Sequence, residues 1–133
     1  MILFHRNSRK EKRKKGTVDY NAQKTQKKYP LNEQGYFGGK GKSKGKASKK
    51  EPVRVIQSKN QFETANDFYL KIGKGGKEKP LSNGHGKQKI MKDGGRVVYR
   101  EKTSTPNSPA VNLSEMKGIV KNQKIHFEKE KKQ

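Results

Sequence analysis

The distribution of apolar residues constrains the fold more than any other feature of the sequence. Only 26% of the 133 residues are hydrophobic, which is too few for a core that spans the whole chain. Residues 1–52 contain 12 of them, whereas residues 53–127 contain 23, grouped into periodic segments. We therefore predict a disordered basic arm over 1–52, a folded domain over 53–128 and a frayed charged tail over 129–133.

The predicted arm contains two lysine-rich runs, at residues 9–15 and 38–46. The second run is a Gly/Lys/Ser sequence of low complexity, which repels itself and has no apolar side chain to bury. Residues 24–30 are compatible with a brief turn. Nothing in this half of the chain predicts a domain.

One helix is predicted after residue 60. Asn60 and Glu63 have the spacing of a capping box, in which each side chain satisfies a backbone donor of the first turn. Gly73 is a typical helix end. The apolar positions between them recur at helical spacing on one face: Phe62, Ala65, Phe68, Tyr69 and Ile72.

Four strands are predicted after the helix, at residues 88–92, 96–101, 110–113 and 123–127. Asp93-Gly94-Gly95 between the first two is a strong hairpin signal. A short lead-in strand is also compatible with residues 53–56. The fold class that follows is α+β: a short helix packed on a four-stranded antiparallel sheet, preceded by the disordered arm.

Strand alternation predicts a polar, cationic face on the side of the sheet away from the helix. If the apolar residues of each strand face the helix, the opposite face collects Arg96, Arg100, Asn112, Lys124 and His126. The alternative register would bury Arg96 and Arg100 without partners, which is unfavourable. The sequence is equally consistent with a face that is simply solvated and binds nothing.

Two loops add candidate binding residues. Residues 82–87 place His85 between glycines and end on Lys87, so backbone there could approach a ligand closely. Residues 103–108 are rich in hydroxyls, and Thr103 and Ser104 could donate to phosphate oxygens. Segments of this composition are also common as plain turns.

The charge balance indicates a polyanionic partner. With 34 Lys and Arg against 12 Asp and Glu, the formal net charge is +22, and binding should weaken steeply with salt.

There is no cysteine, the three histidines are scattered and the acids do not cluster, so we expect no metal and no cofactor. The apolar stretch at residues 1–4 is too short for a signal peptide or a membrane span, so we expect cytoplasmic synthesis and no stable membrane association.

This residue set suits metal-independent cleavage of RNA, in which the ribose 2′-hydroxyl attacks the adjacent phosphorus. Histidine titrates in the range needed for proton transfer, and Arg and Lys stabilise the negative charge that develops on the phosphate. Hydrolysis of DNA usually depends on metal, so RNA is the favoured substrate and DNA the less favoured one.

The half of the chain from residue 66 to residue 127 resembles the C-terminal toxin modules of bacterial polymorphic toxins, of the LXG and contact-dependent growth-inhibition type. The order and spacing of six segments carry the resemblance: ANDFY (65–69), SNGHG (82–86), MKDG (91–94), YRE (99–101), SPAVNL (108–113) and QKIHF (123–127). Such modules are nucleases, most often RNases similar to the barnase, EndoU, colicin and RelE group, with a helical part followed by a four-stranded antiparallel sheet.

The resemblance implies an RNase toxin that cleaves tRNA or rRNA, needs no metal and is blocked by a dedicated acidic immunity protein. It implies delivery into a target-cell cytoplasm by a non-classical route, although full toxins carry a long delivery region that this basic arm does not match. His126 would be the acid or base, Arg100 and Lys124 would stabilise the phosphate, and His85 would be the second proton-transfer group. The alternative function is a non-catalytic RNA- or DNA-binding protein, ribosome-associated or phage-encoded.

Overall fold

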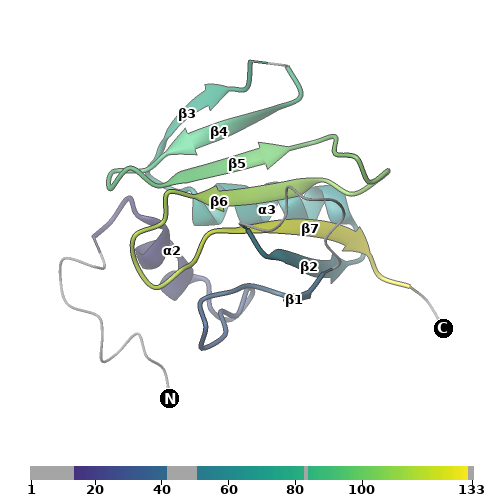
Figure 1. The fold of residues 1–133 in the computed structure, drawn as a ribbon, viewed down its shortest axis with the longest axis horizontal. Coiled ribbons are helices and arrows are strands. Elements are labelled where there is room, and N and C mark those ends of the chain that lie inside the picture. Colours follow the sequence, from purple (N-terminus) through teal and green to yellow (C-terminus); the bar gives the residue numbers. More distant parts are fainter. Residues whose placement is uncertain (1–13, 42–50, 83, 132–133) are drawn as a thin grey trace.

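The computed structural model describes residues 14–41, 51–82 and 84–131. Over these residues the chain forms two helices and seven strands (Figure 1). In chain order they are α2 (Val18–Lys24), β1 (Gly39–Lys40), β2 (Val53–Ser58), α3 (Gln61–Ile72), β3 (Lys77–Pro80), β4 (Gly86–Ile90), β5 (Arg96–Arg100), β6 (Ala110–Ser114) and β7 (Gln123–Lys129).

All seven strands belong to one mixed sheet with the order β1-β2-β7-β6-β5-β4-β3. The strands from β3 to β7 form an antiparallel meander, and β2 adds to its far side by pairing in parallel with β7. Because β2 and β7 are far apart in the sequence, this pairing joins two distant segments of the chain in one sheet.

The predicted fold class is wrong, because the sheet has seven strands and mixed direction and because two helices are present. The two strands that were not predicted, β1 and β3, lie at its edges and carry little hydrophobic pattern. Strand β3 has the sequence KEKP with every residue exposed, and β1 is two exposed residues long. The segment at 53–56, expected only as a lead-in, is the parallel partner of β7. Such pairings depend on backbone hydrogen bonds with distant strands, which periodicity does not record.

The helix predicted from the Asn60 cap is confirmed as α3. The Asn60 side chain accepts hydrogen bonds from the backbone N–H groups of Phe62 and Glu63, and Gly73 is the C-cap. The four predicted strands also correspond to β4, β5, β6 and β7, with shifts of up to two residues at their ends. The local capping signal therefore identified α3, and the hairpin and alternation signals identified four adjacent strands of the sheet.

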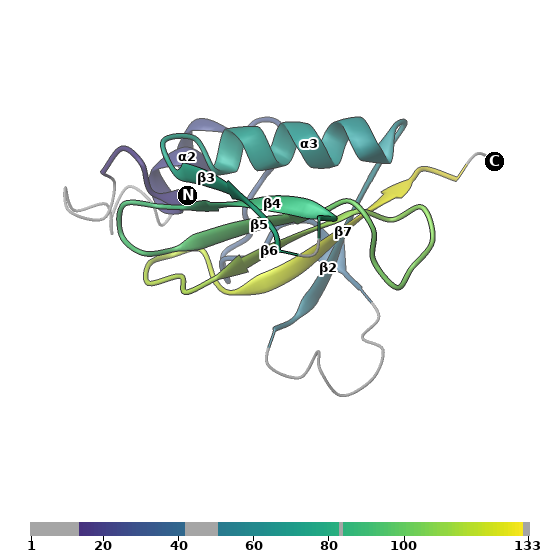
Figure 2. The ribbon, with the colours of Figure 1, turned by 90° about the horizontal axis from the view of Figure 1, so that it is seen from above.

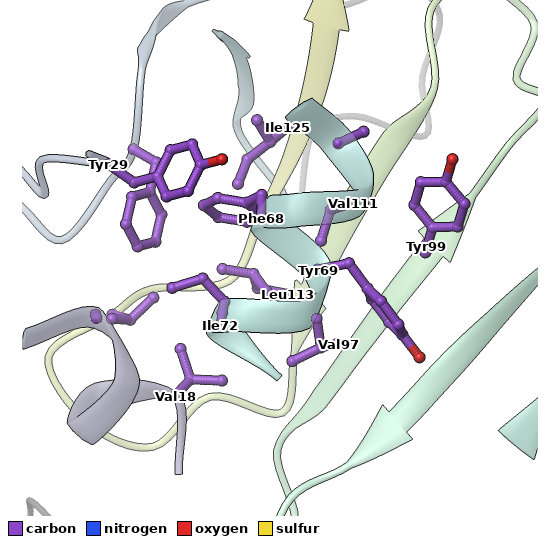
Figure 3. Packing of buried hydrophobic residues seen from close by; sticks show 14 of the residues in the cluster. Val18, Tyr29, Phe68, Tyr69, Ile72, Val97, Tyr99, Val111, Leu113 and Ile125 are labelled. Carbon is purple, nitrogen blue, oxygen red and sulfur yellow. The ribbon is translucent and has the colours of Figure 1, made fainter. Parts of the chain in front are cut away.

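One face of α3 packs on one face of the sheet (Figure 2). Its buried residues are Ala65, Phe68, Tyr69 and Ile72. They share one cluster with Val97, Val111, Leu113 and Ile125 of the three central strands (Figure 3). The ring of Phe127 on β7 belongs to the same cluster and packs on the ring of Phe68. The other face of the sheet has no helix from the described residues packed on it.

The predicted disordered arm is also wrong over residues 14–41, which belong to the core. Val18, Ala22, Tyr29 and Phe37 are buried with α3 and the sheet. Helix α2 is only seven residues long and lies among lysines, so it is stable because of its tertiary packing rather than its own propensity. Most of the two lysine-rich runs, residues 9–13 and 42–46, lies outside the described residues.

The predicted tail is partly built into the sheet. Lys129 is the last residue of β7, and the N–H of Glu130 donates to the carbonyl of Ser58 at 2.8 Å. Residues 132–133 lie outside the described residues.

Buried polar side chains attach the N-terminal segment to the rest of the molecule. The carboxylate of Asp19 accepts the backbone N–H groups of Ile119 and Val120 at 2.8 and 3.0 Å. The amide of Asn21 donates to two carbonyls at the end of α3, those of Ile72 and Lys74. These bonds satisfy groups that would otherwise be buried without partners.

We expect Asp19→Ala to lower the free energy of unfolding by about 1–3 kcal/mol, because it leaves buried backbone donors without an acceptor. Urea titration followed by circular dichroism measures this. The exposed carboxylate Glu33 provides the control, and Glu33→Ala should change stability by no more than about 0.5 kcal/mol. Equal stability of the two variants would contradict the anchoring role of Asp19.

A second attachment is the carboxylate of Asp67 on α3. The Tyr29 hydroxyl donates to Oδ2 at 2.6 Å, and the ammonium groups of Lys71 and Lys28 lie at 2.8 and 3.1 Å. Burial alone would raise the pKa of Asp67, but the hydrogen bonds from Lys71, Tyr29 and Lys28 outweigh it and lower this pKa from 3.8 to about 2. Burial and the same carboxylate raise the pKa of Tyr29.

Because the pKa of Asp67 is lower in the folded state, its stabilising contribution is complete above pH 3.8 and is lost as the pH falls towards 2. The stability difference between wild type and Asp67→Asn should therefore be largest near neutral pH and shrink over that acidic window. Urea titrations at several pH values measure it. Tyr29→Phe removes one hydrogen-bond donor to the Asp67 carboxylate, so it should raise the pKa of Asp67 in the folded state and move the lower end of this pH window upward. A difference independent of pH would contradict this account.

Candidate functional site

The register of the sheet brings the five predicted polar residues onto the face away from α3, called the open face here. His126, Ala110 and Arg100 form one cross-strand row, and Lys124, Asn112 and Val98 form the next. Arg96 lies on the same face, opposite Ser114 and nearer the other end of β5. The predicted clustering of these side chains on one face is confirmed, because strand alternation and cross-strand pairing both follow from backbone geometry.

A hollow of about 630 Å³ lies on this face where β2, β6 and β7 run side by side. Asn112, Lys124 and His126 line it, together with the apolar side chains of Val53 and Val55. The remaining lining residues come from β2 and β7 themselves and from segments around them: Lys40, Gly41, Glu51, Gln57, Ser104, Thr105, Glu128 and Lys131. Two carboxylates and three ammonium groups thus line the same hollow as one imidazole.

A hydrogen-bonded chain connects Arg100 to this hollow. The Arg100 Nε donates to the Asn112 Oδ1 at 3.3 Å, and the Asn112 Nδ2 donates to the Glu51 Oε1 at 3.2 Å. Arg100 itself is not part of the lining and lies on β5, the strand next to the one that carries Asn112. Asn112 therefore orients a carboxylate toward the hollow and holds a guanidinium beside it.

The His126 ring is held from one side by the loop before β6. Its Nδ1 lies 3.0 Å from the hydroxyl of Ser108, which is buried. The two residues come from β7 and from a loop eighteen positions earlier, so only the folded sheet brings them together.

The carboxylates Glu51 and Glu128 were not among the predicted site residues. Glu128 follows His126 by two positions, so strand alternation could have found it if the strand had been extended past Phe127. Glu51 precedes β2 and reaches the hollow only because β2 pairs with β7. No local signal in the sequence indicates that position.

Two predicted residues lie away from the hollow. His85 directly precedes β4, and its carbonyl accepts a hydrogen bond from the N–H of Glu101. Strand β4 is separated from β7 by three strand spacings of about 4.8 Å each. Lys87 lies opposite Tyr99 on the helix side, with its Nζ 5.3 Å from the Tyr69 ring centroid. The structure does not bring either side chain beside His126.

Of the remaining predicted residues, one lines the hollow and two make hydrogen bonds within the protein. Ser104 lines the hollow. Thr103 instead donates its hydroxyl to the carbonyl of Ser108 at 2.7 Å, within its own loop. The Arg96 guanidinium donates to the Gln88 Oε1 at 2.5 Å on the neighbouring strand.

Within residues 14–41, 51–82 and 84–131, no group of three or more His, Asp or Glu side chains is placed to hold a metal ion. Neither helix of this described part is long and apolar enough to cross a membrane. Comparison with protein-family models, curated proteins and solved structures finds no match for this chain.

Proposed function

We propose that this chain is a metal-independent endoribonuclease whose active site is the hollow on the open face. The observation that carries the proposal is that one hollow is lined by an imidazole, His126, by lysines that include Lys124, and by two carboxylates. A proton donor, a proton acceptor and a cation within one site are what transphosphorylation of RNA requires.

The charge of the chain supports an RNA substrate. A formal charge of +22 attracts polyanions, and Lys124 and Arg100 add fixed positive charge on or beside the hollow. The ammonium of Lys124 would contact the scissile phosphate. The guanidinium of Arg100, held by Asn112, would stabilise charge from behind it.

In the proposed reaction the ribose 2′ oxygen forms a bond to phosphorus while the bond from phosphorus to the 5′ oxygen breaks. One group takes the proton of the 2′-hydroxyl and another gives a proton to the departing 5′ oxygen, so the products are a 2′,3′-cyclic phosphate and a 5′-hydroxyl. His126 is one of these groups. Glu51 or Glu128 is the other, since both share its hollow and His85 does not.

The biological setting follows from the resemblance to polymorphic-toxin modules. In that setting the targets are tRNA or rRNA, the site of action is the cytoplasm of a competing cell, and an acidic immunity protein covers the open face of the toxin before its release. The cationic side chains on that face are suited to such a partner.

We expect the wild-type protein to cleave bacterial RNA in the presence of EDTA, leaving cyclic phosphate ends. His126→Ala should lower the cleavage rate by roughly 10²- to 10⁴-fold, the usual contribution of a general acid or base. His85→Ala is the matched control and should retain activity, because His85 lies three strands away. Gel analysis of total RNA with end-group assignment measures both, and Glu51→Gln and Glu128→Gln identify the second group.

The same assay contains the outcome that rejects the proposal. Intact RNA that is nevertheless retained by the protein in a salt-sensitive manner would leave a non-catalytic nucleic-acid-binding protein. Equal loss of activity in His126→Ala and His85→Ala would show that the active site is not in the hollow.

Binding gives a separate prediction. Arg100→Ala and Lys124→Ala together remove two positive charges on or beside the hollow and should reduce the slope of log affinity against log salt by up to about 1.4 for single-stranded RNA. Lys27→Ala with Lys74→Ala removes the same charge from exposed positions just after the two helices and should leave the slope nearly unchanged. Fluorescence anisotropy with a labelled oligoribonucleotide measures both slopes. Equal changes would indicate that the open face is not the binding surface.

A further inference from the structure

The hydroxyl of Ser108 lies between two groups of β7. Its Oγ is 3.0 Å from the Nδ1 of His126 and 3.2 Å from the carbonyl oxygen of Phe127. Ser108 is 4% exposed, so water does not compete freely for either contact. A hydroxyl has a single proton, and the group that receives it decides the protonation pattern of the imidazole.

The proline that follows Ser108 determines which group receives that proton. Strand β6 pairs Ala110 with His126, and the same antiparallel register places Pro109 opposite Phe127. The N–H of Phe127 donates to the carbonyl of Pro109 at 2.9 Å, but proline has no N–H to give in return. The carbonyl of Phe127 is therefore left without its ladder donor in a buried strand, and Ser108 supplies the replacement.

With its proton on the Phe127 carbonyl, the Ser108 oxygen can only accept from His126. We propose that Ser108 is a positioning residue that keeps a proton on Nδ1 of His126, so that Nε2 is the nitrogen that gains and loses a proton. The second half of this statement rests on the proposed ribonuclease function; the first half concerns the protein alone.

Hydrogen bonds fix the position of the loop that carries Ser108. The Thr103 hydroxyl donates to the Ser108 carbonyl at 2.7 Å, and the Ser108 N–H donates to the Thr105 carbonyl at 3.3 Å. Gln61, at the start of α3, donates to the carbonyl of Asn107 at 2.9 Å. The hydroxyl-rich loop, predicted as a phosphate contact, thus supports the imidazole through Ser108.

This arrangement suits both proton-transfer roles of His126. Neutral imidazole with its proton on Nδ1 takes a proton at Nε2, and the imidazolium that results gives the same proton back from Nε2. The bond from Nδ1–H to Ser108 persists in both states, so the ring keeps its orientation through a reaction cycle.

Long-range proton–nitrogen NMR of ¹⁵N-labelled protein tests the tautomer without any substrate. Above the pH at which His126 becomes neutral, we expect the wild type to show a protonated Nδ1 and an unprotonated Nε2. Ser108→Ala should shift the population toward the Nε2–H form that an unconstrained histidine side chain prefers in water, and Ser108→Thr, which keeps a hydroxyl, should restore the wild-type pattern. A predominantly Nε2–H tautomer in the wild type would overturn the proposal, and that result needs no variant to fold.

RNA cleavage provides the second measurement. We expect Ser108→Ala to lower the rate by about 10-fold, which is less than the 10²- to 10⁴-fold that loss of an acid or base causes, and we expect Ser108→Thr to recover most of the rate. An Nδ1–H tautomer in a protein that cleaves no RNA would reject the ribonuclease function but leave the role of Ser108 in place. Active wild-type protein with unchanged tautomer and rate in Ser108→Ala would reject the role of Ser108 and leave the ribonuclease function standing.

Discussion

The contacts of the Phe68 ring join the three parts of the molecule. On α3, this side chain meets Tyr29 and Phe37 of the N-terminal segment edge to face, with ring centroids 5.0 Å away in each case, and meets Phe127 of β7 at 5.5 Å. Aromatic pairs of this geometry add to the stabilisation from burial itself. The helix, the segment over residues 14–41 and the sheet therefore share one core, in a chain with few apolar residues to divide between cores.

Concentrating most of the apolar residues on one side of the sheet leaves the other side to polar groups and a few apolar side chains. Because side chains alternate along a strand, burying Ile125 and Phe127 against the helix places Lys124 and His126 on the open face. The parallel pairing of β2 with β7 then sets Val53 and Val55 beside them, and the hollow forms between these strands. The position of the candidate site is thus a consequence of how the core is built.

Much of the centre of the fold could be predicted, and most of its periphery could not. The Asn60 cap and the turn after Met91 are local signals, which the chain satisfies with neighbouring residues. The N-terminal segment is different, because Asp19, Asn21 and Gln123 make hydrogen bonds to groups between 51 and 101 positions away. Side chains that look like ordinary surface polar residues become buried anchors only when distant backbone groups reach them. For the same reason, Ser108 and Glu51 were not recognised as parts of the site.

The sequence by itself determined the cationic character of the protein, the helix α3, the central strands and the choice of residues on the open face. Each of these follows from composition or from contacts within a few residues. The tertiary structure alone decided that residues 14–41 join the core, that β2 closes the sheet and that His126 shares a hollow with Glu51, Glu128 and Lys124 while His85 does not. These outcomes depend on which distant strands pair and in what register, and hydrogen bonds between backbones carry no side-chain pattern that a reader of the sequence can recognise.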